Sequence, residues 1–498
     1  MDSPVQVRCY ESNGYFCRLF PPATQPIARA EEDRLIQLGE AMRYDVEREG
    51  ILTPRVGYTY FSQFVGHDLT RDVTPLNGTC PGDQLTPNFR TPYLNLEQLY
   101  GGGPKVSPHL YEGKAEAEVF KIGKSLEHRY PRDLLIQNGQ VLVADDRNLD
   151  NLIVRQLHLV FLKFHNEAVA QLSPNRLRVS DSDALGPGTI FERAQRLVTW
   201  HYQWIVQYDL LPRILHNNIW DRQRVTATSL FQSNEPFSIP FEFSLAAFRF
   251  GHSMVRNAYA LNCRRKRVAL PELMAVGHTS SPLPDDLLVE WGRFFDGLPV
   301  SGPVASSLFI DTSIVAPLHD LAPSTIRLCS NADSVPESAR LPVRTLLRGG
   351  RHRLASGQEV ARTLVDHGMI RARDCLTTTE LGQDLCNHSG SVLREMRLEH
   401  NTPLFYYLLK EAEIKGFGRT LGPIGSYIVN YTIDRALDRD SNPYLSRQSR
   451  RRAKLPVWQF PNGSQRTVHS LREIIRLVGD EKLLPDCDTK ARNLQPSN

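Results

Sequence analysis

The chain has 498 residues, of which 41% are hydrophobic and 23% charged, a composition that is ordinary for a globular protein with a large core. No apolar run reaches the roughly 18–20 residues that a membrane-spanning helix needs, so we expect no transmembrane segment. The formal net charge of +4 is a mild excess. The basic runs at 264–267 and 447–454 do not form a continuous stripe with interleaved aromatic residues, so we expect no nucleic-acid partner.

The N-terminal sequence, MDSPVQVRCYESNG, is acidic and polar where a signal peptide would be basic and then apolar. This favours a cytoplasmic protein, or a secreted one from which a leader has been removed. Eight cysteines are scattered along the chain without a CxxC pair, so we expect free thiols and no zinc site. A bridge between Cys9 and Cys17 is an alternative that nothing else in the sequence supports.

Helical periodicity dominates the chain. Apolar residues recur at helical spacing from residue 152 onward, and similar patterns cover residues 190–211, 240–259, 287–295 and 404–415. Glycine, proline and polar residues indicate loops at 75–92, 101–103 and 173–187. We predict a mainly α fold with one large helical domain, long loops and few short strands. Residues 1–59 would form an N-terminal arm and the start of the domain, 60–455 its core and 456–498 a C-terminal extension.

The first polar cluster lies in residues 60–70, which we predict to be helical. Gln63 and His67 are four residues apart and therefore share one face of the helix, while Asp68 points about a quarter-turn away. A histidine beside a carboxylate in this way can serve two neighbouring sites. A capping or surface histidine is the alternative, and for a lone histidine it is the more common one.

A second cluster, Asp-Asp-Arg-Asn-Leu-Asp-Asn at 145–151, precedes a long predicted helix. Acidic residues at a helix start interact favourably with the helix dipole, which is a structural explanation for Asp145, Asp146 and Asp150. The positive charge of Arg147 is unfavourable there. A buried partner or a role in catalysis would explain this arginine.

The third cluster lies at 244–254, which we predict to be one apolar helix. Arg249 and His252 are three residues apart and would lie on one face, and Gly251 would let a flat group approach the backbone closely. Arginine pairs well with carboxylates and histidine can ligate a metal ion. A haem offers an iron and two propionates. A core helix with a hydrogen-bonded histidine is the alternative.

These clusters resemble the motifs of the peroxidase–cyclooxygenase superfamily, and in particular the bacterial members of the animal-type haem peroxidases. The matching stretches, in the family's order, are QFVGHDLT, DDRNLDN with LHLVFLKFHNEA, AFRFGHSMV and TLLRGGRHRLASGQ. A fifth stretch, TPLFYYLLKEAE with GRTLGPIGSYIV, is similar to the family's C-terminal helical region. Four ordered motifs spanning about 60–455 are far more specific than any one of them.

The resemblance implies a haem b cofactor and a role for each matching residue. His67 would be the distal acid–base catalyst, Arg147 would stabilise charge on the peroxide, and Gln63 would order distal water or substrate. His252 would be the axial iron ligand, and Arg249 and Arg348 would hold the propionates. Further matches are Asp150, in the place of the family's distal Glu, and Thr345, where Asn usually accepts the proximal imidazole hydrogen bond.

The resemblance also implies a Ca2+ site, with ligands at Asp68, Thr91, Tyr93 (through its carbonyl), Asn95 and Glu97. All can offer the oxygen donors that calcium prefers. Asn95 stands where Asp is usual, which removes charge, and Glu97 can restore it. A plain turn with a polar face is the alternative.

Three positions depart from the family's pattern. Gly66 stands where mammalian members carry an Asp esterified to the haem, so this ester cannot form, and the shorter side chain of Asp150 makes the other ester doubtful. Thr345 has a shorter reach than Asn. A weaker partner leaves His252 less imidazolate-like, which should raise the iron reduction potential.

We therefore expect a haem peroxidase that reduces hydrogen peroxide and oxidises a small-molecule reductant, phenolic or aromatic, or a halide. One alternative is a fatty-acid dioxygenase of the same superfamily. Cyclooxygenases carry a radical-forming Tyr three residues before the proximal His, where this chain has Arg249, and Tyr259 is on the wrong side. The others are a non-catalytic haem-binding protein and a non-haem metal site at His67, Asp68 and His165.

Overall fold

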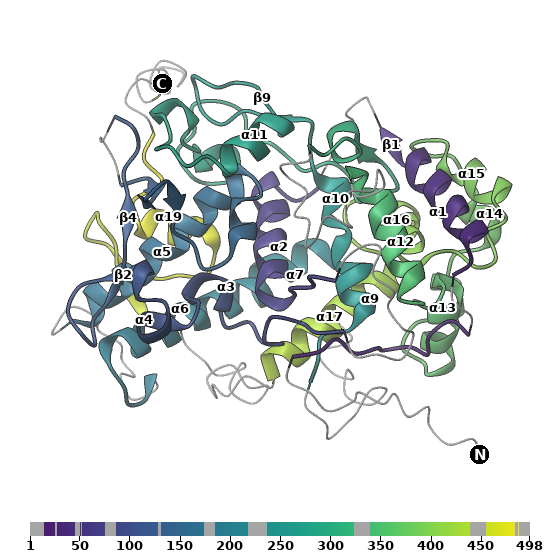
Figure 1. The fold of residues 1–498 in the computed structure, drawn as a ribbon, viewed down its shortest axis with the longest axis horizontal. Helices are drawn as coiled ribbons and strands as arrows, with labels where there is room; N and C mark the ends of the chain where they lie inside the picture. The colour runs from purple at the N-terminus through teal and green to yellow at the C-terminus, as the bar shows by residue number, and fades with distance from the viewer. Residues whose placement is uncertain are drawn as a thin grey trace.

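The computed structural model describes residues 14–24, 27–44, 50, 52–74, 86–127, 131–173, 185–217, 237–322, 339–438, 455–483 and 487. In these residues the fold is mainly helical, as predicted, and the buried apolar side chains form one continuous core. Figure 1 shows α2 near the middle of the molecule, with α5 and α6 on one side and α12, α13 and α16 on the other. The few strands are short and pair two by two.

The strand pairs are β1 (Arg43–Tyr44) with β10 (Ile314–Val315), which run parallel, and the antiparallel pairs β2 (Tyr111–Glu112) with β3 (Val119–Phe120), β4 (Ile122–Gly123) with β5 (Asp133–Leu134), β6 (Ile136–Gln137) with β7 (Gln140–Val141), β8 (Ala258–Tyr259) with β9 (Val268–Ala269), and β11 (Val457–Gln459) with β12 (Gln465–Thr467). Short α-helices are α3 (Glu97–Tyr100), α4 (Gly103–Val106), α7 (Leu211–Ile214), α11 (Leu270–Gly277), α14 (Thr378–Leu381) and α15 (Ser389–Glu395). Short 3-10 helices are η1 (Pro108–Leu110), η2 (Asp146–Leu149), η6 (Asp285–Leu287), η7 (Trp291–Arg293), η8 (Ala316–Leu318) and η12 (Ala372–Asp374).

The first half of the chain builds a layer of helices around α5 (Leu152–Leu172), which packs against α2 (Val56–Leu69) and α6 (Ile190–Ile205). The Asn151 side chain caps α5 by accepting a hydrogen bond from the backbone of Val154. A capping box of Thr189 and Glu192 begins α6, which continues through a π-helical turn (Val206–Leu210). The helices predicted from 152 and over 190–211 are confirmed.

The second half adds α12 (Leu341–Arg351), α13 (Gly357–Asp366), α16 (Leu404–Lys415) and α17 (Pro423–Asp438), with α1 (Arg29–Ala41) packed against α12. The helix predicted at 404–415 is confirmed. The buried carboxylate of Glu411 on α16 accepts hydrogen bonds from the backbone N–H groups of Ile424 and Gly425, which are unpaired donors in the first turn of α17. Burial raises the pKa of Glu411 to about 8, although these two hydrogen bonds lower it.

The segment at 240–259 is not one helix, so that prediction was wrong. It consists of α9 (Phe241–Leu245), η5 (Ala247–Arg249) and α10 (Gly251–Met254), because the backbone of Ala246 leaves the helical region (φ −134°, ψ −73°). The helix predicted at 287–295 is also wrong. Its buried backbone pairs with distant segments instead, as in the hydrogen bond from Glu290 N–H to the Leu261 carbonyl.

A disulfide joins Cys263 to Cys487 across 224 residues, so the expectation of free thiols throughout was wrong. The C-terminal α19 (Leu471–Leu477) packs against α5. Cys17 is a buried thiol that donates to the Ser238 carbonyl, while Cys9 lies outside the described residues. None of the helices that the structure describes combines the length and apolar character needed to span a lipid bilayer.

Candidate active site

His67 lies buried near the C-terminal end of α2. Its Nδ1 is 3.0 Å from Oδ1 of Asn148 on η2, and its Nε2 is 3.8 Å from Oδ2 of Asp150. One turn earlier on the same face, Gln63 donates from Nε2 to Asp150 at 3.4 Å and accepts from the Asn151 side chain. The structure therefore brings together Gln63, His67 and Asp150, three residues singled out from the sequence.

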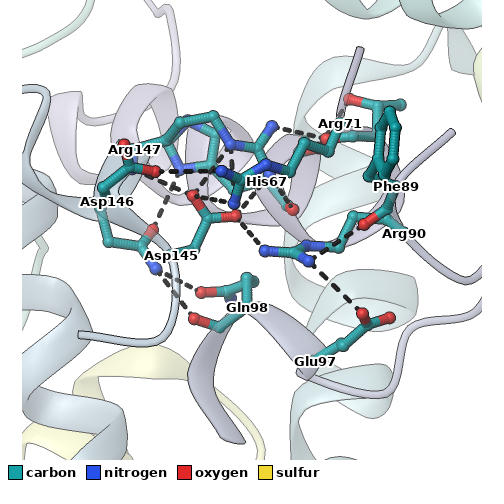
Figure 2. A network of polar contacts seen from close by, with 12 residues as sticks. His67, Arg71, Phe89, Arg90, Glu97, Gln98, Asp145, Asp146 and Arg147 are labelled. Carbon is teal, nitrogen blue, oxygen red and sulfur yellow. Dashed lines mark hydrogen bonds and ion pairs between the residues drawn. The ribbon is translucent and has the colours of Figure 1, made fainter. Parts of the chain in front are cut away.

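Arg147 joins this group from η2 (Figure 2). Its Nη2 donates to the His67 carbonyl at 2.8 Å and its Nη1 to the Thr70 carbonyl at 2.5 Å, so it caps the end of α2. Its Nε and Nη2 also donate to the carboxylate of Asp145. These contacts use four of the five guanidinium N–H groups and leave one for a ligand, counting only partners in the described part of the chain.

Asp145 is a fully buried side chain among cations. Burial alone would raise its pKa, but hydrogen bonds and charge from Arg147, with charge from His67 and Arg90, hold the pKa far below its ordinary value. The acidic residues do not lie at the start of α5, which begins at Leu152 with Asn151 as its cap; Asp145 instead caps the short η2, accepting from Arg147 N–H, and Asp146 lies in the first turn of η2. The positive charge of Arg147 is explained by this buried partner.

Arg90 extends the network toward the 91–97 loop, as Figure 2 shows. It pairs with Asp145 through Nη2 and with Glu97 through Nη1, the latter at 3.4 Å. Arg71 lies 3.5 Å from Asp145 on another side. Sequence reasoning missed Arg71, Arg90 and Asn148. The spacing Asp-x-Arg-Asn at 145–148 could have indicated part of this network, because it places the carboxylate of Asp145 two residues before Arg147.

His252 lies on α10, which packs against α2. Burial lowers the pKa of His252 well below its ordinary value, and the charges of Arg249 and Arg344 lower it further, so the imidazole is neutral, as metal ligation requires. Its buried Nδ1 has no hydrogen-bond partner among the described residues. The Thr345 hydroxyl donates to the Leu341 carbonyl, so the structure does not make the predicted bond between Thr345 and His252.

Several guanidinium groups gather beside His252. Burial, followed by the charges of Arg348 and Arg344, lowers the pKa of Arg249 to about 10. Arg249 donates from Nε to the Ser244 carbonyl, and Arg348 pairs with Asp72 at 3.2 Å and donates to the Thr74 carbonyl. The cations repel one another, and an anionic ligand would relieve this repulsion.

These residues fit a haem. A Cβ built on Gly251 would meet no atom within 4 Å, and one built on Gly66 would meet only Phe248, at 3.6 Å. A Cβ at either position would therefore not clash with the rest of the protein. His252 can supply a neutral nitrogen to iron, and Arg249 and Arg348 can supply charge to two carboxylates.

The predicted calcium loop is closed by contacts among its own side chains. Glu97 accepts hydrogen bonds from the N–H and hydroxyl of Thr91, and Asn95 donates to the same hydroxyl at 2.8 Å. Asp68 is fully buried and accepts from Leu96 N–H through Oδ2, and the hydroxyl of Tyr202 lies close enough to its carboxylate to lower its pKa. Burial raises the pKa of Asp68 to about 7.

The loop of Thr91 to Glu97, with Tyr93 inside it, therefore lies beside a fully buried carboxylate, that of Asp68 on α2. Across the residues that the structure places, no three His, Cys, Asp or Glu side chains form a metal-binding group. The alternative non-haem site is wrong, because His165 bonds instead to the Tyr100 hydroxyl and the Glu118 carbonyl.

Comparison with known proteins finds similarity to haem peroxidases both in part of the sequence and in the fold. Residues 68–276 match the family model described as animal haem peroxidase. The chain is 28% identical over 198 residues to "Peroxidase-like protein" from Margaritifera margaritifera, and 28% identical over 123 residues to "Dual oxidase 1" from Caenorhabditis elegans. These segments are 38% and 25% of this chain but only 24% and 8% of those relatives.

Solved structures share the fold over almost the whole chain. Peroxidase A from Dictyostelium discoideum superposes with a TM-score of 0.61 at 14% identity, covering 95% of each chain. Oryza sativa fatty acid alpha-dioxygenase gives 0.64 at 14% identity, covering 96% of this chain and 82% of that one. The fold is thus the helical fold of haem peroxidases and related dioxygenases. Over residues 68–276 the chain resembles the animal haem peroxidases in sequence, and over almost its whole length it resembles members of the peroxidase–cyclooxygenase superfamily in fold.

Proposed function

We propose that this protein is a haem peroxidase that reduces hydrogen peroxide and oxidises a small organic donor, phenolic or aromatic, or a halide. The observation that carries the proposal is the hydrogen bond of 2.8 Å from Arg147 to the His67 carbonyl. It joins, at one end of α2, a residue that can move a proton and a residue that can stabilise negative charge.

His252 would ligate the iron, and Arg249 and Arg348 would pair with the propionates. When bound, haem supplies the electrons that cleave the O–O bond, and the donor substrate then returns them. His67 takes the proton from one peroxide oxygen and delivers it to the other, so that water can leave. Arg147 stabilises the negative charge that grows on the leaving oxygen, through its charge and its remaining N–H.

The test is a rapid-mixing measurement of the haem-loaded protein with hydrogen peroxide, followed in the Soret region. Replacing His67 by Ala should slow the peroxide-dependent spectral change by about a hundredfold or more, because general acid–base catalysis is lost. Steady turnover of a phenolic donor by the parent would separate an enzyme from a non-catalytic haem-binding protein. A parental rate in the His67→Ala variant would overturn the proposal.

The second candidate is a fatty-acid dioxygenase. What favours it is the likeness of fold to fatty acid alpha-dioxygenases from Oryza sativa and Arabidopsis thaliana, each covering 96% of this chain. Against it stands Arg249, three residues before His252, where a radical-forming tyrosine would be needed. Oxygen uptake with palmitate or an unsaturated fatty acid, without added peroxide, would favour this candidate over the peroxidase.

We also propose that Ca2+ binds between Asp68 and the 91–97 loop. The buried carboxylate of Asp68 beside this loop supports it; Thr91, Asn95 and Glu97 would exchange their mutual contacts for the ion, and Tyr93 would offer its carbonyl. Added Ca2+ should raise the melting temperature of chelator-treated protein, and Asp68→Asn should abolish this rise. An unchanged melting temperature would remove calcium from the proposal.

The Cys263–Cys487 disulfide supports an oxidising compartment, as for a secreted protein, over the cytoplasm. Mass spectrometry of the protein isolated from its native source, alkylated before and after reduction, tests this. Detection of both cysteines as alkylated thiols without reduction would favour the cytoplasm.

A further inference from the structure

The buried amide of Asn148 lies between two histidines. Its Oδ1 faces Nδ1 of His67 at 3.0 Å, and its Nδ2 faces Nδ1 of His158 at 3.1 Å. The Nδ2 side also faces two oxygens of Gln98, the side-chain oxygen at 2.6 Å and the backbone carbonyl at 3.3 Å. A backbone carbonyl can only accept a hydrogen bond. The carbonyl of Gln98 therefore fixes Nδ2 on its own side and Oδ1 on the side of His67.

Since Oδ1 of Asn148 can only accept, Nδ1 of His67 must carry a hydrogen. In the neutral imidazole the proton acceptor is then Nε2, the nitrogen on the side of Asp150. The other end of the amide is consistent with this assignment. Burial lowers the pKa of His158 to about 3, so this ring is neutral and its Nδ1 can accept from Asn148.

We propose that Asn148 is a positioning residue that holds His67 in the Nδ1–H tautomer, with Nε2 ready to accept a proton from peroxide. This inference rests on the proposed peroxidase function and adds a residue to it. In the opposite tautomer, Nε2 would carry a hydrogen and could not take one from the substrate. Asn148 thus selects the reactive form of the ring without touching the substrate.

The direct test reads the tautomer and does not depend on turnover. The full-length chain is labelled with 15N-histidine, loaded with diamagnetic zinc protoporphyrin, and examined by long-range 1H–15N NMR at a pH where His67 is neutral. The His67→Ala variant assigns the resonances. We expect a protonated Nδ1 and an unprotonated Nε2. A protonated Nε2 in the parent protein would overturn the inference.

Two variants separate tautomer control from simple packing. Asn148→Leu removes the acceptor, and we expect it to shift the tautomer toward Nε2–H and slow the peroxide reaction of the haem-loaded protein about tenfold, less than full loss of the imidazole. Asn148→Asp keeps an oxygen acceptor for Nδ1–H. The Nε2 of Gln98, which has no partner among the described residues, can turn to donate to the new carboxylate. We expect this variant to keep the parental tautomer and a rate within about threefold of the parent.

Asn262→Leu is the matched control. Asn262 is fully buried, and its side-chain partners among the described residues are backbone groups: its oxygen accepts from the N–H groups at 264 and 265, and its nitrogen donates to the carbonyls at 286 and 288. Its loss should lower stability and leave the His67 tautomer and the rate unchanged. If Asn148→Leu does not fold, the spectra of the parent and of Asn148→Asp still decide. If His67→Ala is slow but Asn148→Leu changes neither tautomer nor rate, this inference fails and the proposed function stands. If His67→Ala reacts at the parental rate, the proposed function itself is overturned.

Discussion

Asp145 accepts hydrogen bonds from two nitrogens of the Arg147 guanidinium, Nε at 3.0 Å and Nη2 at 2.6 Å. The same carboxylate pairs with Arg90, which in turn contacts Glu97 (Figure 2). One buried anion therefore fixes the candidate catalytic arginine and connects it to the loop at 91–97. The site depends on this carboxylate as much as on the residues that face the substrate.

Replacing Asp145 by Asn should destabilise the protein by about 3 kcal/mol, because removing one charge of a buried ion pair leaves its cationic partners uncompensated. Urea unfolding followed by circular dichroism measures this change. The matched control is Asp146→Asn, since the Asp146 side chain is 58% exposed and its contact with Arg71 is 3.5 Å long. Asp146→Asn should change the free energy of unfolding by less than about 1 kcal/mol. Equal losses in both variants would contradict the role given to Asp145.

Asp145 should also make stability depend on pH. Its pKa is lowered in the folded state, so its contribution is fully present above the unfolded pKa of about 4 and is lost as the pH falls below that value. Unfolding free energies measured from pH 6 down to pH 3 should therefore fall more steeply for the parent than for Asp145→Asn. Parallel curves would show that Asp145 does not carry this pH dependence.

The sequence was sufficient to predict those helices that depend on residues close together in the chain. The helices α5 and α16 have helical apolar spacing and follow Asn151 and Pro403, residues that suit a helix start. It was not sufficient at 240–259, where the chain breaks at Ala246 and the short pieces α9 and η5 pack against α17, which is distant in sequence. Patterns of spacing register only neighbours within a few residues.

The same reasoning explains which parts of the site were found. The motif around His67 and Arg147 could be recognised because each stretch is short and ordered along the chain. The pairing of Asp145 with Arg90 joins positions 55 residues apart, and no periodicity reports such a contact. The disulfide of Cys263 and Cys487, separated by 224 residues, is non-local in the same way.

Glu411 should give the opposite pH dependence in the alkaline direction. Its folded pKa is raised to about 8, so the stability it supports is fully present below the unfolded pKa of about 4.3 and falls as the pH rises toward and through 8. Glu411→Gln stays neutral and should flatten the decline in unfolding free energy between pH 6 and pH 9. A decline of the same slope in the variant would assign it to other groups.

The disulfide should stabilise the C-terminal part of the fold. Cys263→Ser should lower the free energy of unfolding by about 2–4 kcal/mol, because the bridge restricts the unfolded chain. A reducing agent should lower the stability of the parent protein by a similar amount and leave that of the variant unchanged. Cys375→Ser is the control, since Cys375 is a half-buried free thiol. If the parent and Cys263→Ser unfold at the same urea concentration without reductant, the bridge contributes nothing.

Arg249 should matter for retention of haem more than for folding. Its guanidinium lies beside Arg348 and near His252, and a bound anion would relieve the repulsion among these cations that Asp72 leaves uncompensated. Arg249→Met should therefore weaken haem binding by about tenfold, a loss of roughly 1.4 kcal/mol that is within the range of one charge-assisted hydrogen bond. The protein without haem should be as stable as the parent or more so, since one repelling charge is gone. Haem titration in the Soret region and urea unfolding of the haem-free chain measure the two effects.

Arg371→Met, which removes a half-buried arginine paired with Asp374, should leave haem affinity unchanged. Parental haem affinity in Arg249→Met would place the anionic edge of the cofactor elsewhere.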